Sequence, residues 1–436
     1  MPSAREKSEL LLSFFGLFVS ISSPNYQQTP EKLFEIMKKA TLCLLACLLY
    51  SLPAIQNASA QLPDGQTIVT LTAEAVGLMD NGEPDEAIRL LEDALELDPD
   101  NYACQYEMAY AYYVKQNYTK AIKLLKPLTK HPDCNALLYQ LLGNAYDMQG
   151  NSNKALKTYE AGLERFPDAG PLYLERGTVL GLQGHLSDAV KSYVTGIKVD
   201  PLFASNYYRA AQFYSLTIAP VMGMYFAEIF MILEPDGTRN AEMSRLLFDS
   251  YKKHLTMQED GTLKAQFCDD EFYIATVAIV LNNPKTPTLP FEILYDEGVR
   301  AAVESETQVD LASLNRIRTR FFSFCWENMD DIQMRLKTYD YPDLSSFFSF
   351  IREVEQAGYL EAYNYWLLRE GNWDEFQAWY KQDPQKLTAF AEWFEEHDMK
   401  IVDPQELLNE LQAEAEEKTD TTESGVSSGE TGASSM

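Results

Sequence analysis

Residues that could support catalysis are few and scattered along this sequence. The four histidines form no HExxH motif, and the chain contains neither a GxSxG motif nor a glycine-rich phosphate loop. The carboxylates of residues 268–272 (CDDEF) and of the pair Glu395 and Glu396 could serve as general acid and base. Such groups are also ordinary at a helix N-terminus and on a solvated helix face. We therefore expect no catalytic residues, and only residues 236–415 leave room for an unrecognised hydrolase domain.

The cysteines lack the spacing of metal ligands. Beyond residue 60 there is no CxxC pair and no cysteine with histidines at metal-ligand spacing among Cys104, Cys134, Cys268 and Cys325. We expect neither a metal nor a cofactor, and we interpret these cysteines as buried small residues. In an oxidising compartment Cys104 and Cys134 could form a disulfide, which their spacing alone does not decide.

The composition describes a folded and strongly acidic protein. Of 436 residues, 46% are hydrophobic and 12% aromatic, which is enough apolar material for about two or three domains. The 65 acidic side chains exceed the 36 basic ones, so the net charge is -29. A nucleic acid or an anionic membrane would be repelled by this charge, and we expect no nucleic-acid partner.

An export signal is predicted near the N-terminus. Residues 37–60 contain a lysine pair, an apolar stretch too short to span a bilayer, and small residues at Ala58 and Ala60. This pattern predicts a signal peptide cleaved after Ala60, with translation starting at Met37 and residues 1–36 as an over-called extension. The alternative is that the apolar stretch 10–21, also too short to span, is a genuine second segment.

The predicted signal places the protein in the periplasm or outside a bacterial cell, with no integral membrane span in the mature chain. A lipid anchor at Cys47 is a second possibility, because Leu44, Leu45 and Ala46 precede that cysteine. The apolar run continues beyond Cys47, whereas a lipidated cysteine should end it.

Between residues 65 and 235, small residues recur with a period of 34 residues and prolines recur at intervals of 33 to 35 residues. Ala87, Ala121, Ala155 and Ala189 keep the 34-residue spacing without exception. Prolines that cannot continue a helix follow these alanines at Pro99, Pro132, Pro167 and Pro201, and Pro235 ends the fifth repeat. The small residues allow two helices to approach closely, and one such hairpin cannot bury its apolar face alone. The period therefore predicts a stack of helical hairpins.

The pattern resembles the tetratricopeptide repeat (TPR), a helix-turn-helix unit of 34 residues. The most complete match consists of Leu142, Gly143, Tyr146, Ala155, Tyr159, Gly162 and Pro167. The resemblance implies an all-α, right-handed solenoid of about five repeats over residues 65–235. In the fifth repeat Gly223 replaces the alanine, and we expect its apolar second helix to be buried against the second half of the chain.

In this family the first helix of each repeat lines a concave face that binds a peptide or protein. The resemblance places eight residues on that face: Tyr106, Tyr110, Tyr113, Gln140, Asn144, Asp147, Tyr208 and Gln212. Tyrosines offer contact area and a hydrogen-bonding hydroxyl, which suits an extended peptide or a partner helix. The alternative is that the tyrosines form an aromatic packing face.

Some family members grip the terminal carboxylate of chaperone tails with five polar residues. Only two of the five positions match here, and Glu175 would repel a carboxylate. We therefore reject a chaperone-adaptor function for this chain.

The second half is expected to be helical to residue 415, with a boundary near the proline-rich residues 282–290. Aspartates stand where N-caps are expected, at Asp310, Asp343 and Asp383. Residues 416–436 are mostly serine, glycine, threonine and acidic residues, which predicts a disordered tail.

For the whole protein we expect an exported binding scaffold. The alternatives are a hydrolase domain in residues 236–415 or a lipid-anchored envelope assembly factor. The oligomeric state stays open.

Overall fold

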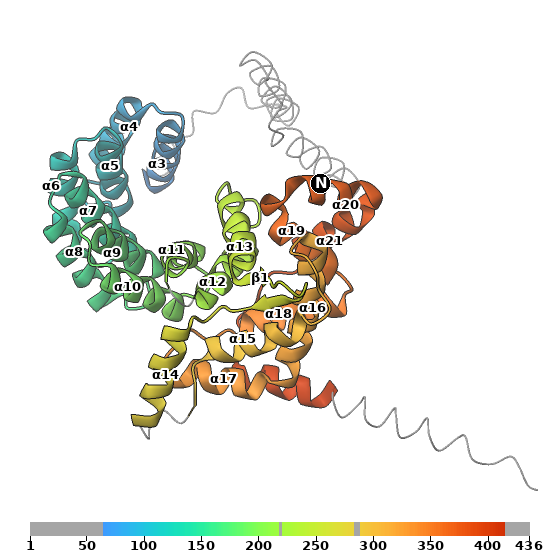
Figure 1. Ribbon diagram of the computed structural model, residues 1–436. Helices are drawn as coiled ribbons and strands as arrows, with labels where there is room; N and C mark the ends of the chain where they lie inside the picture. The colour runs from blue at the N-terminus through green and yellow to red at the C-terminus, as the bar shows by residue number, and fades with distance from the viewer. Residues whose placement is uncertain (1–63, 218–219, 283–287, 415–436) are drawn as a thin grey trace, which may run out of the picture. The chain divides into compact units, whose positions relative to one another are not determined.

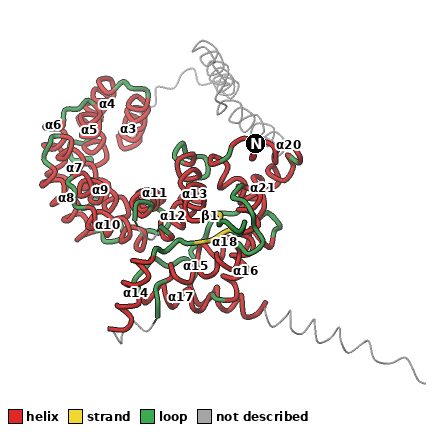
Figure 2. Tube along the Cα trace, in the orientation of Figure 1, coloured by secondary structure: helices red, strands yellow, loops and turns green. Residues whose placement is uncertain are grey.

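The computed structural model describes residues 64–217, 220–282 and 288–414, and most of these residues are helical. Two short strands, β1 (Leu255–Met257) and β2 (Leu263–Ala265), pair antiparallel in the part described (Figure 2). The predicted all-α fold is confirmed. The predicted extension, signal peptide and acidic tail, residues 1–36, 37–60 and 416–436, lie outside the described residues.

In the first ten helices of the described chain, each helix from α4 to α11 packs against the next one along the chain (Figure 1). Their bounds are α3 (Asp64–Asp80), α4 (Pro84–Leu97), α5 (Tyr102–Val114), α6 (Tyr118–Leu128), α7 (Ala136–Met148), α8 (Ser152–Arg165), α9 (Gly170–Leu182), α10 (Leu186–Val199), α11 (Ala204–Tyr214) and α12 (Val221–Leu233). They form a repeat array of the predicted kind, in which each hairpin buries its apolar face against the next one.

The array packs through the small residues that the period predicts. The four alanines of the 34-residue ladder, Ala87, Ala121, Ala155 and Ala189, are completely buried. A methyl group added to Gly177 on α9 would lie 2.5 Å from a ring carbon of Tyr193 on α10. The tyrosine ring thus fills the space that a glycine leaves, and the two helices of a hairpin fit closely.

The fifth hairpin connects the array to the second half of the chain. Helix α12 is buried at every position from Val221 to Ile232, and it contacts α11, α13 and α15. This burial confirms the expectation drawn from its apolar sequence. A continuous buried core extends from Leu180 to Leu407, so apolar packing does not stop at Pro235. The division into domains at residue 235 stays a prediction.

The second half is built from helices with a range of lengths. They are α13 (Asn240–His254), α14 (Asp270–Asn282), α15 (Phe291–Ala302), α16 (Leu311–Glu327), α17 (Met329–Thr338), α18 (Ser345–Gln356), α19 (Leu360–Leu368), α20 (Trp373–Gln382) and α21 (Pro384–Glu396), with a 3-10 turn η1 (Arg369–Gly371). Residues 404–414 are also helical.

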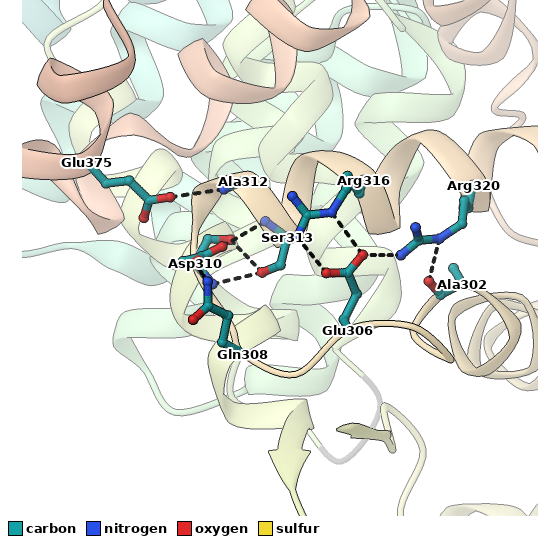
Figure 3. Close-up of polar contacts among 9 residues, drawn as sticks. All are labelled: Ala302, Glu306, Gln308, Asp310, Ala312, Ser313, Arg316, Arg320 and Glu375. Atoms are coloured by element: carbon teal, nitrogen blue, oxygen red, sulfur yellow. Dashed lines mark hydrogen bonds and ion pairs between the residues drawn. The ribbon is translucent and has the colours of Figure 1, made fainter. Parts of the chain in front are cut away.

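Two of the three predicted aspartate caps are confirmed. Asp310 accepts a hydrogen bond from the Ser313 amide at 2.7 Å and caps α16 (Figure 3). Asp383 caps α21 by accepting from the Gln385 amide at 3.2 Å. Asp343 accepts from the Ser345 amide, but α18 begins one residue later than predicted, with Leu344 at the cap position.

Candidate partner-binding face

The predicted binding residues lie on helices that are neighbours in space. Helix α5 contacts α7, α7 contacts α9, and α9 contacts α11, so the odd-numbered helices form one row. Figure 1 shows this row on the inner side of the curved array, with the even-numbered helices outside. Three predicted residues come from α5, three from α7 and two from α11. We call the surface made by α5, α7 and α9 the inner face.

The tyrosines of α5 form a partly exposed aromatic strip. The rings of Tyr110 and Tyr113 stack with centroids 6.4 Å apart, and Tyr106 stacks on Tyr102 at 6.3 Å. Tyr110 is 38% exposed, and Tyr106 and Tyr113 are half-buried. Within the described chain, the hydroxyls of Tyr106, Tyr110 and Tyr113 have no hydrogen-bond partner. They are available to a ligand.

Burial keeps two of these hydroxyls protonated. It raises the pKa of Tyr106, with a smaller contribution from the neighbouring Glu107. Burial is also the largest cause of the raised pKa of Tyr113, and the neighbouring Tyr118 and Glu175 raise it further by smaller amounts. Because both groups remain neutral well above pH 7, they can donate hydrogen bonds over the whole physiological range.

The amides predicted on α7 meet a carboxylate from α9. Gln140 Nε2 donates to Glu175 Oε1 at 2.9 Å, and Asn144 Nδ2 approaches the same oxygen at 3.4 Å. Asn144 Oδ1 accepts from the buried Tyr159 hydroxyl at 2.6 Å. Glu175 therefore belongs to the site, although sequence reasoning used it only to reject a chaperone clamp. It precedes the small Gly177 by two residues, and that position could have signalled it.

Carboxylates without a cation partner characterise this surface. Glu107, Asp147 and Glu175 make no ion pair with any residue that the structure describes. Asp147 accepts from Ser152 Oγ at 2.6 Å, which fixes its orientation at the end of α7. Burial raises the pKa of Glu107, and Asp80 raises it further. The inner face thus combines free tyrosine hydroxyls with negative charge.

Two family models match the array, both described as tetratricopeptide repeat, over residues 78–133 and 136–168. This is a tetratricopeptide repeat protein. No curated protein sequence matches the chain.

Several solved structures resemble part of this TPR protein. One is the TPR protein TTC0263 of Thermus thermophilus, with 20% identity, a TM-score of 0.36, and coverage of 41% of this chain and 98% of that one. PilF of Pseudomonas aeruginosa has 16% identity and a TM-score of 0.38, covering 51% and 94%. YrrB, described as a TPR protein with an unusual peptide-binding site, has 20% identity and a TM-score of 0.30, covering 42% and 90%.

The two predicted residues on α11 have partners inside the TPR protein. The Tyr208 hydroxyl donates to Glu242 Oε2 at 2.5 Å, and Gln212 Nε2 donates to Glu242 Oε1 at 2.7 Å. The guanidinium of Arg239 lies 4.7 Å from the centre of the Tyr208 ring, which is only 9% exposed. These contacts tie α11 to α13. The structure therefore separates Tyr208 and Gln212 from the free hydroxyls of α5, and their role in binding stays a prediction.

The cysteines and carboxylates considered above for metal binding or acid-base chemistry lie buried, at a helix N-terminus or exposed on a helix. Cys104, Cys134, Cys268 and Cys325 are free and buried, and no group of His, Cys, Asp or Glu in the described ranges could hold a metal ion. Asp269 accepts from the Phe272 amide at 2.7 Å at the start of α14. Glu395 and Glu396 are exposed on α21. A cleft of about 580 Å³ beside α17 contains none of the predicted binding residues.

Within residues 64–217, 220–282 and 288–414, no helix is both long enough and apolar enough to cross a bilayer.

Proposed function

We propose that this TPR protein is an exported scaffold that binds a protein or peptide segment on its inner face. TPR repeats indicate protein partners. The observation that supports the inner face as the binding site is the tyrosine strip of α5. Its three hydroxyls lack partners within the described chain and lie one helix away from the pair of amides bound to Glu175. Aromatic side chains with free polar tips are typical of surfaces that recognise peptides.

The ligand segment that fits this surface carries lysine or arginine. The inner face contributes the unpaired carboxylates of Glu107, Asp147 and Glu175, so a basic side chain would gain an ion pair on binding. An acidic segment would be repelled by the same groups.

The test is crosslinking and affinity capture from the native envelope with the mature protein and a Tyr106→Ala/Tyr110→Ala/Tyr113→Ala variant. The matched control replaces the exposed lysines of the outer helices, Lys123, Lys157 and Lys191, with alanine. We expect the tyrosine variant to lose one partner selectively while its circular dichroism spectrum stays helical. Equal loss in the control, or retention of every partner in the tyrosine variant, would refute the inner face as the binding site.

Export is tested by sequencing the N-terminus of the protein isolated from its own cells. We expect a mature N-terminus at Gln61 and recovery from the periplasmic or extracellular fraction. A lipidated N-terminus at Cys47 would instead indicate the anchored form of the scaffold. An intact Met37 in the cytoplasmic fraction would overturn the proposal of export.

A further inference from the structure

Helix α14 (Asp270–Asn282) is rich in apolar residues, yet it is largely exposed. Only Thr276 is buried on the whole helix. Four large apolar side chains are exposed by between 48% and 79% of their area: Tyr273, Ile274, Ile279 and Leu281. A helix that is apolar all round is normally buried inside a protein. Figure 1 shows α14 at the edge of the second half.

The exposed residues extend around most of the helix. Successive residues of an α-helix are rotated by about 100°, so Tyr273, Leu281 and Ile274 succeed one another around one side. Ala278, Ala275 and Ile279 continue the apolar surface around the next side, and Thr276 occupies the remaining direction. A flat surface or a single helix covers only one side. A groove that encloses the helix covers most of this apolar surface.

The charges near α14 limit the occupant of this surface. Asp269, Asp270 and Glu271 stand at its N-terminus, and the helix contains no lysine or arginine. Interfacial membrane helices typically carry basic residues on their polar face, and the net charge of -29 opposes an anionic bilayer. A second copy would bring the same three carboxylates and the same net charge. A groove bordered by basic side chains would instead attract this helix.

We propose that α14 is a second docking element, independent of the inner face, which inserts into an apolar groove bordered by lysine or arginine on a partner protein. The apolar residues supply most of the affinity, and the acidic N-terminus fixes the direction of insertion. The TPR protein would then hold two partners at separate sites.

The test starts from the full chain expressed in its own cells with the photo-crosslinker p-benzoylphenylalanine at position 274. The crosslinked partner is identified, purified, and titrated calorimetrically with the mature protein. We expect the crosslink to map to an apolar groove with basic residues at its border. Ile274→Glu combined with Leu281→Glu should weaken binding by about tenfold or more, because two apolar anchors are lost.

The control and a milder variant keep the test decisive. Leu186→Glu combined with Ile401→Glu makes the same change at residues of comparable exposure away from α14, and it should leave binding unchanged. Leu281→Ser alone should weaken binding without changing the melting temperature. The proposal is overturned by a crosslink to lipid or to a second copy, by the absence of any crosslink, or by binding that is indifferent to both α14 variants.

Discussion

Arg318 on α16 and Glu228 on α12 form an ion pair inside the core. Arg318 Nη1 lies 3.1 Å from Glu228 Oε2, and the two residues are only 3% and 4% exposed. Burial disfavours the charge on Arg318, but the attraction of Glu228 is strong enough that the pKa of the guanidinium stays above its ordinary value. Tyr363 donates to Glu228 Oε1 at 2.7 Å, and Asn364 accepts from Arg318 Nε at 2.7 Å. The pair joins the fifth hairpin to the second half.

Replacing Arg318 with methionine should lower the free energy of unfolding by about 3–5 kcal/mol, because Glu228 would remain buried without its partner. Urea denaturation followed by circular dichroism measures the change. Arg89→Met is the control, since Arg89 and Glu86 form an exposed pair on α4, and we expect a change below about 1 kcal/mol there. An equal loss of unfolding free energy in the two variants would show that burial of the ion pair does not determine the cost of breaking it.

Glu306 should make stability depend on pH. Its carboxylate accepts from Arg316 Nε at 3.0 Å and from Arg320 Nη2 (Figure 3). The hydrogen bond with Arg316 is the largest influence and, with Arg320, lowers the pKa of Glu306 despite burial. Because the folded pKa lies below the unfolded one, this stabilisation is complete above the unfolded pKa and is lost as the pH falls through the folded pKa.

The matching variant is Glu306→Gln, compared with the wild type by urea denaturation between neutral and acidic pH. We expect the variant to be less stable at pH 7 and the difference to shrink as the solution is acidified below the unfolded pKa of glutamate. A difference that stays constant over this range would show that the carboxylate charge is not responsible.

Gln116→Gly should stabilise the array by about 1 kcal/mol, because a non-glycine residue in the left-handed region carries backbone strain. Gln116 has a φ of 58°, and it takes the turn position that Gly82, Gly150 and Gly184 occupy in the other repeats. Thermal unfolding measures the gain. Gly150→Ala is the reverse control and should lower the melting temperature, although an added Cβ there meets nothing within 4 Å. A Gln116→Gly variant no more stable than the wild type would argue against strain.

Gly177→Ala should destabilise the fourth hairpin by about 1–3 kcal/mol, since the added methyl collides with the Tyr193 ring. Gly77→Ala on α3 is the control, because its Cβ would meet nothing within 4 Å and alanine favours a helix. We expect the control to be neutral or more stable in urea denaturation. Destabilisation of the same size in both variants would show that the close packing of Tyr193 is not the cause.

The local features of the fold could be predicted from the sequence. Ala87 and its equivalents recur with the period of the hairpin, and each side chain meets a neighbour a fixed number of residues away. Asp310 caps α16 through a residue only three positions further on. The apolar sequence of α12 predicts its burial by itself. Such features depend on the spacing of residues along the chain, which can be read directly from the sequence.

Tertiary structure alone decided which polar groups remain free. Tyr106, Tyr110 and Tyr113 keep unpartnered hydroxyls in the described chain, whereas Tyr208 is bound by Glu242, 34 residues away. Glu228 pairs with Arg318, which lies 90 residues further along the chain and is related to it by no sequence repeat. Long-range pairs depend on how whole helices cross, and crossing is determined by the summed packing of many side chains. For that reason the sequence could predict a binding surface, but only the folded chain separates its free groups from its occupied ones.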